Sequence, residues 1–83
     1  MQGNHEDQEQ HVVHVIRKGI RQEIRISLSK FKGRRFADVR TFLCNRAGEV
    51  VPTPKGVTVP VEQLAELEMA VRKVREAAEA ALP

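Results

Sequence analysis

The sequence is poor in the features that stabilise many small domains. It has a single cysteine, Cys44, among 83 residues, so no disulfide can form within the chain. A domain of this size buries only about 60% of the surface that its unfolded chain exposes. Such domains commonly gain stability from a disulfide, a metal or a partner chain. We therefore expect a second copy of the chain to supply stability, and the lone thiol favours a reducing compartment.

Long hydrophobic runs are also missing. No apolar stretch approaches the roughly 20 residues that a membrane-spanning helix requires, and residues 1–10 are polar and acidic, unlike a signal peptide. We expect an intracellular protein, in the cytoplasm, nucleoid or nucleus, with no membrane partner. The composition of residues 1–10 predicts a disordered acidic tail, which leaves residues 11–83 as one domain.

Residues suited to catalysis or metal binding are few. The three histidines, His5, His11 and His14, all lie near the N-terminus. On a regular strand, His11 and His14 would point to opposite faces, so they would not form a metal-binding pair without a bend. Cys44 has no motif around it, and no glycine-rich phosphate loop is present. We predict a non-enzymatic protein with no catalytic residue, metal or cofactor.

Apolar periodicity predicts an α+β fold of four antiparallel strands and one C-terminal helix. Val12, Val13, Val15 and Ile16 are β-branched and indicate a first strand, and a period of two marks a second strand over residues 24–29. A hairpin turn is expected at Lys32-Gly33, followed by a third strand over 34–44 and a turn over 45–48. Prolines place the fourth strand, over 49–59, at an edge or make it irregular.

Both faces of the third strand carry apolar residues. Ala37, Val39 and Leu43 are expected on one face, and the alternate residues from Phe36 to Phe42 on the other. Such a strand is covered on both sides or contains a bulge.

The period changes to that of a helix over about 61–82. Leu64, Leu67, Val71 and Val74 form one apolar stripe, typical of an amphipathic helix. Such a stripe either packs in the core of one chain or forms a helix–helix seam in a dimer. A single helix can cover only one face of the sheet, so the other face is exposed or buried by a partner.

Positive charge is concentrated in the middle of the chain. Residues 17–55 hold eleven Lys or Arg and three acids, between acidic segments on either side. A basic block favours a polyanionic partner, because binding releases condensed counterions. The alternative is a solvated basic surface without a ligand.

One aromatic ring stands among the cations of the predicted second hairpin. Binding of single strands needs cations along a groove and flat rings on which bases stack. Phe31 has the position of such a ring, and three further basic residues on neighbouring strands extend the track. The candidates within the hairpin are Lys30, Phe31, Lys32, Arg34 and Arg35, and those beyond it are Arg25, Arg40 and Lys55.

Five short motifs, in order and at matching spacing, resemble one family. They are Phe31-Lys32-Gly33, Asp38-Val39-Arg40, Gly48-Glu49, Pro52 with Lys55-Gly56-Val57, and Glu62-Gln63-Leu64. Residues from Ile24 to about Val74 are similar to the DNA-binding domain of the transcriptional positive cofactor 4 family, without a gap from Ile26 to Leu64. The resemblance implies a homodimer with two antiparallel channels for single-stranded or melted DNA, bound with little sequence preference.

The resemblance also implies roles for single residues. It makes Phe31 the stacking aromatic, Lys32 and Arg34 the loop cations, Arg40 the strand arginine, and Lys55 with Gly56 the contacts of the fourth strand. Two positions depart from the family: Leu43 replaces a second stacking ring, a tryptophan, and Ser29 replaces an arginine. Because a ring is lost, two other partners stay open: an acidic protein of the transcription machinery, or single-stranded RNA.

Overall fold

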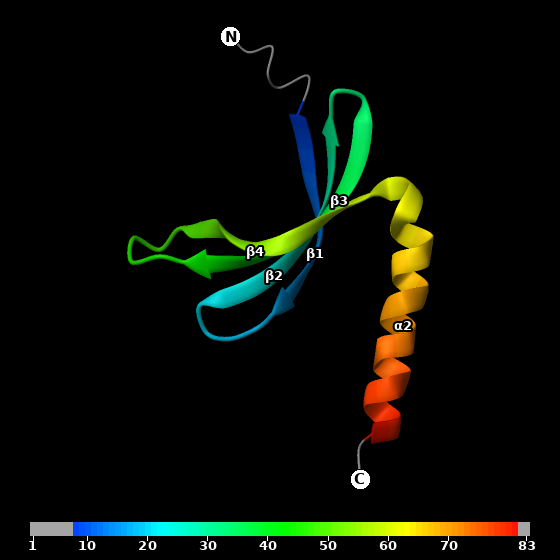
Figure 1. Cartoon of the computed structure of the whole chain (residues 1–83). Coiled ribbons are helices and arrows are strands. Elements are labelled where there is room, and N and C mark those ends of the chain that lie inside the picture. Colours follow the sequence, from blue (N-terminus) through cyan, green and yellow to red (C-terminus); the bar gives the residue numbers. More distant parts are fainter. Residues whose placement is uncertain (1–7, 82–83) are drawn as a thin grey trace.

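The computed structural model describes residues 8–81 and has four strands followed by a helical segment (Figure 1). The strands are β1 (Gln8–Arg17), β2 (Gln22–Phe31), β3 (Arg34–Cys44) and β4 (Val50–Pro60). A 3₁₀ turn, η1 (Val61–Gln63), leads into the helix α2 (Leu64–Ala81). The strands pair antiparallel in the order β1-β2-β3-β4, so the predicted sheet followed by a helix is confirmed. The sheet is strongly twisted, and its β2–β3 and β3–β4 hairpins project in different directions (Figure 1).

The β2–β3 hairpin turns where the sequence predicts it. Phe31 and Arg34 are the last paired residues, and Lys32 and Gly33 join them. Both turn residues have positive φ, 53° at Lys32 and 80° at Gly33. Positive φ at two consecutive positions is what the type I′ hairpin turn requires, and its twist matches that of the strands.

The first strand corrects two expectations. It begins at Gln8, so residues 8–10 belong to the sheet and not to a tail; the rest of the predicted tail lies outside the described residues. The register of β1 shifts between Val12 and His14, so that His11 pairs with Leu28 and His14 with Ile26. A bulge adds one residue to one strand, and the two histidines therefore lie on the same face of the sheet.

The fourth strand is an edge strand with an irregular centre, as its prolines predict. Arg40 pairs with Gly56 and Phe42 with Pro52, so β4 uses four residues where β3 advances by two. The extra residues bulge out, because a proline has no N–H to donate to the ladder.

The register divides the side chains between two faces. The apolar face carries most of the aliphatic residues, namely Ile16, Ile24, Ile26, Leu28, Ala37, Val39, Leu43, Val57 and Val59. The polar face consists of Glu23, Arg25, Ser27, Ser29, Asp38, Arg40 and Thr58, together with Phe31, Phe36 and Phe42. The predicted division of β3 is thus confirmed, since β2 and β3 pair without interruption from Gln22 to Phe31.

Burial within one chain is slight. Among residues 8–81, Ala37 is the only buried hydrophobic residue, at 8% exposure. α2 buries no residue: Leu64 and Leu67 are half-buried, and Val71 and Val74 are 57% and 67% exposed. The interpretation of the helical stripe as the core of one chain is therefore wrong, because α2 runs away from the sheet after η1 contacts β3.

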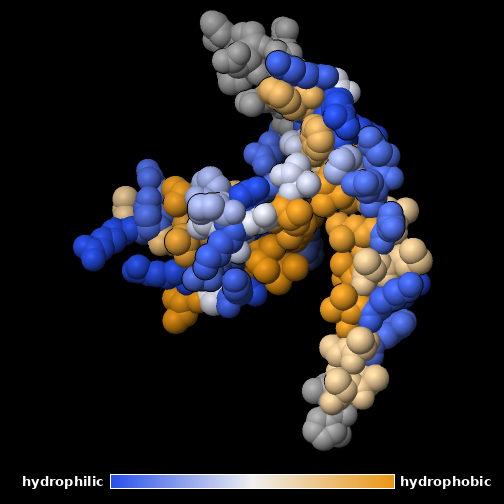
Figure 2. Space-filling model, viewed as in Figure 1, coloured by the Kyte–Doolittle hydropathy of each residue, from blue (hydrophilic) through white to orange (hydrophobic). Residues whose placement is uncertain are grey.

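The apolar surfaces of the sheet and of α2 border a common space. Figure 2 shows hydrophobic side chains along the inner side of the helix and on the sheet opposite, with an open gap between them. None of the helices within residues 8–81 has the length and apolar character to cross a membrane.

Candidate nucleic-acid interface

The end of the β2–β3 hairpin gathers the aromatic ring and the cations that the sequence singles out. Phe31 is 42% exposed, although it is a large apolar side chain. The Nζ atom of Lys32 lies 5.2 Å from the centroid of the Phe31 ring. Positive φ at Lys32 holds the chain in the tight turn that sets this cation beside the ring. An exposed ring next to an ammonium group offers one stacking surface and one phosphate contact.

The hairpin distributes its cations over both faces of the sheet. Lys30 and Arg35 are directly opposite each other on the apolar side, and Phe31 and Arg34 on the polar side. Like charges directly opposite each other on a sheet destabilise it. Neither Lys30 nor Arg35 makes an ion pair with any residue whose side chain the structure describes. An anion bound between them would relieve this repulsion.

Arg34 is less available for a phosphate contact than the other cations of the hairpin, because its side chain already has partners within the chain. Its guanidinium lies 5.3 Å from the centroid of the Phe36 ring. It also approaches the Glu62 carboxylate of η1 at 3.7 Å, with both side chains exposed. Exposed ion pairs contribute little, so a phosphate group can displace Glu62 from Arg34 at small cost.

Arg25 and Arg40 are opposite each other on the polar face, and each has its own carboxylate partner. Arg25 pairs with Glu23 and lies 4.6 Å from the centroid of the Phe42 ring. Both arginines are partly buried. The predicted track therefore has two cations that are already neutralised within the chain.

Arg40 and Asp38 are both on β3, and each makes a hydrogen bond to a residue of β4. Arg40 donates two hydrogen bonds of 3.0 Å to the Asp38 carboxylate and one of 3.0 Å to the carbonyl of Thr53 in the β4 bulge. Thr58 donates to the same carboxylate at 2.9 Å. The hydrogen bonds from Arg40, aided by that from Thr58, lower the pKa of Asp38 in spite of its partial burial. Arg40 has a structural role here, whether or not it also contacts a ligand.

Gly56 is required by close packing of β4 on β3. A Cβ atom at this position would stand 2.7 Å from the carbonyl oxygen of Val39 and 2.9 Å from Cα and Cβ of Arg40. Two of these three atoms are backbone atoms, which cannot easily move. Steric packing is thus sufficient to explain glycine at this position, independently of any ligand.

Gly56→Ala is expected to destabilise the fold by about 1–3 kcal/mol, as overpacking of a well-packed site does. Urea unfolding followed by circular dichroism measures the change. Gly19→Ala is the matched control, because a Cβ atom there meets nothing within 4 Å and the φ of Gly19 is not positive. Equal stability of the two variants would contradict this packing role of Gly56.

Leu43 and Lys55 line one pocket at the far end of the sheet. The pocket has a volume of about 450 Å³ and is completed by Gln22, Thr41, Thr53 and Pro54. Leu43 is 37% exposed in it. Gln22, which pairs with Leu43, is nine positions from Phe31 on β2, about 30 Å along the strand. Leu43, at the position where the resemblance predicts a second ring, therefore lies in a separate aliphatic pocket with one cation, Lys55.

A second pocket lies near the hairpin and was missed by the sequence analysis. It has a volume of about 400 Å³ and takes Gln10 and His11 from β1. The bulge in β1 carries no compositional signal that would have predicted this placement. Within residues 8–81, no group of three or more His, Cys, Asp or Glu is arranged to hold a metal ion.

The chain is similar to one known protein family over most of its length. The family described as Transcriptional Coactivator p15 (PC4) matches residues 18–70, which is more than half of the sequence. The chain belongs to the PC4 family. The match begins after β1, so the family model does not cover this strand. No curated protein matches the chain.

Solved PC4 homologues share this fold. A homologue from Burkholderia pseudomallei K96243, in a tetragonal crystal form, is 31% identical, with a TM-score of 0.75 over 81% of this chain and 98% of that one. The orthorhombic form gives 33% identity and a TM-score of 0.72 over 77% and 86%. The bacteriophage T5 homologue of the eukaryotic coactivator PC4, implicated in recombination-dependent DNA replication, is 21% identical, with a TM-score of 0.65 over 88% and 82%.

Proposed function

We propose that this PC4-family chain is a non-enzymatic module that binds single-stranded or melted DNA with little sequence preference. Its biological setting would be transcription regulation, replication or repair. The observation that carries the proposal is the β2–β3 hairpin, where the exposed Phe31 ring lies beside Lys32 and opposite Arg34, while Lys30 and Arg35 lie on the other face of the same hairpin. Stacking tolerates any base because every base has a π-face, and the cations contact the phosphates.

We further propose that two copies of the chain act together as a homodimer. One chain has almost no core, while the apolar face and the inner side of α2 are both open. Burial of apolar surface contributes about 25 cal/mol per Å², and a partner in this gap would supply the burial that one chain lacks. The stripe of Leu67, Val71 and Val74, in which both valines are exposed, suits a helix–helix seam.

The salt dependence of binding tests the electrostatic part of the proposal. Lys30, Lys32, Arg34, Arg35 and Lys55 are the exposed cations of the candidate interface. If they neutralise five phosphates, log K should fall against log salt with a slope of about −3.5, from about 0.7 per contact with a single strand. Titration of a labelled oligonucleotide at several salt concentrations measures the slope. A slope near zero would contradict the proposed contacts.

A second candidate function is docking of an acidic protein, such as a subunit of the transcription machinery. The observation in its favour is the pocket of Leu43 and Lys55, which offers an aliphatic surface and one cation but no ring. An acidic peptide fits such a site as well as a nucleotide does. Competition separates the two: an oligonucleotide displaces an acidic protein only if both use the same surface. Binding of an acidic partner that no oligonucleotide disturbs would favour this second function.

A further inference from the structure

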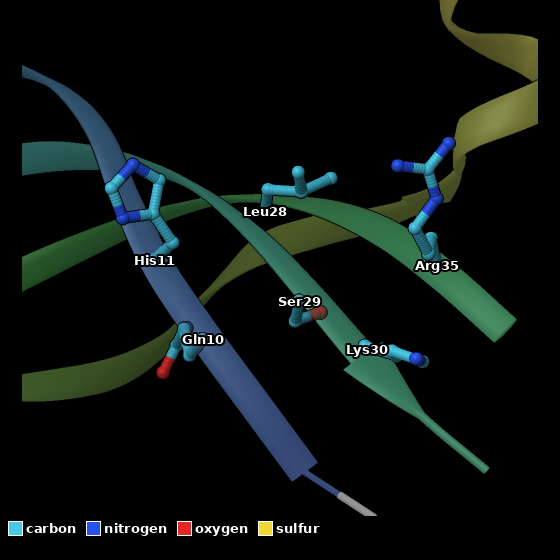
Figure 3. Close-up of a pocket in the computed structure, with 6 residues that line it drawn as sticks. All are labelled: Gln10, His11, Leu28, Ser29, Lys30 and Arg35. Carbon is cyan, nitrogen blue, oxygen red and sulfur yellow. The ribbon is translucent and has the colours of Figure 1, made fainter. Parts of the chain in front are cut away.

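The pocket beside the hairpin is built partly from the strand that the family match leaves out. Figure 3 shows His11 from β1 and Arg35 from β3 on opposite sides of Leu28, with Lys30 further along β2. Gln10 and Ser29 complete the lining of this open pocket of about 400 Å³, and the register places their side chains on the polar side of the sheet. β1 ends at Arg17 and the family match begins at Lys18, so the contribution of β1 is outside the residues that the family model matches.

The lining combines the groups that recognise one nucleotide. The imidazole of His11 is a flat ring, and histidine is among the side chains on which unpaired bases stack. Leu28 forms an apolar floor beside that ring. The ammonium of Lys30 and the guanidinium of Arg35 are suited to the phosphate.

The bulge in β1 is what places His11 in this lining. Because the register shifts only after Val12, His11 pairs with Leu28 on the apolar side of the sheet. Leu28 lies three residues before Phe31 on β2, about 10 Å along the strand, and Lys30 lies between them. Phe31 is on the polar side, so a strand of DNA would pass around the hairpin end from one ring to the other.

We propose that His11 is a second base-stacking platform and that its pocket holds one nucleotide of the bound single strand. This inference rests on the proposed function and deepens it. The platform supplies a second ring in a chain that has Leu43 where the resemblance predicts one. Its phosphate lies between Lys30 and Arg35 and relieves the repulsion of these opposed cations.

A tryptophan reporter tests the platform directly. The chain contains no tryptophan, so His11→Trp introduces a single indole in the pocket. Stacking of a base on it should quench its fluorescence when an oligothymidine is added. His14→Trp is the matched control, because His14 is on the same strand and face but does not line the pocket. Quenching of the first indole and not of the second supports the proposal.

Two outcomes of this experiment would overturn the proposal. Equal quenching of both indoles would mean that the signal does not come from stacking in the pocket. An indole at position 11 that is blue-shifted in the free protein and unaffected by DNA would mean that the second copy covers the pocket. Either result leaves the binding of DNA by the hairpin intact.

The affinity of His11 variants for single-stranded DNA provides a second test of the proposal. His11→Ala should weaken binding about fivefold, the lower end of the effect of one stacked base, because imidazole is a small ring. His11→Phe should restore it. If the wild type binds and Phe31→Ala weakens binding, but the His11 variants equal the wild type, only the present inference fails. If the wild type does not bind single strands, the proposed function itself fails.

Discussion

Phe31→Ala is expected to weaken binding of single-stranded DNA by about fivefold to 140-fold. This range corresponds to about 1–3 kcal/mol for the loss of one stacked base. Phe31 is exposed at the end of a hairpin and pairs across the strand with another exposed residue, Arg34. Its ring therefore contributes little to the fold of one chain, so the substitution should lower the affinity for DNA and leave the stability of the fold almost unchanged. Fluorescence polarisation with a labelled oligonucleotide measures the affinity.

Controls separate stacking from a general loss of apolar surface. Ile20→Ala removes a side chain that is 98% exposed in the turn between β1 and β2, far along β2 from the hairpin. It should leave affinity unchanged, while Phe31→Trp should retain or increase it. Thermal unfolding should give similar midpoints for all three variants. Unchanged affinity in Phe31→Ala would remove this ring from the interface.

Replacing Val71 and Val74 together by aspartate is expected to dissociate the proposed dimer. Both valines are more than half exposed in one chain, on the stripe that we assign to the helix–helix seam. Two carboxylates in that seam would be buried without partners, which is strongly unfavourable. The mass from light scattering should fall from twice 9.4 kDa to 9.4 kDa, and the DNA affinity should fall with it.

Lys73→Asp is the control with the same change in net charge. It lies between the two valines in sequence but off the apolar stripe, so its variant should remain dimeric. Since one chain has hardly any core of its own, the double variant should also lose secondary structure by circular dichroism. A wild-type protein that is a stable monomer of 9.4 kDa would contradict the dimer.

Much of the sheet could be predicted because its signals are local. The alternation of Ile24, Ile26 and Leu28 sets β2, and a lysine followed by glycine with positive φ sets the hairpin turn. Pro52 and Pro54 predict the irregular edge of β4, since each removes a donor from the ladder. These features depend only on neighbours within a few residues.

The remaining features depend on partners distant in sequence. No residue in β1 signals its bulge, so the sequence places His11 and His14 on opposite faces and the register places them on one. The sequence also presents Arg25 and Arg40 as free cations, because the pairing of each with a carboxylate becomes visible only in three dimensions. The direction of α2 depends on what covers its stripe, and that is not decided within a single chain.

The most direct test of the central claim compares three ligands of equal length by fluorescence polarisation. Single-stranded DNA, duplex DNA and single-stranded RNA are titrated with the protein at one salt concentration. Stacking on Phe31 requires unpaired bases, so the single strands should bind more tightly than the duplex. Equal affinity for single-stranded and duplex DNA would reduce the interface to a non-specific basic surface, and no binding of either DNA would contradict the proposed function.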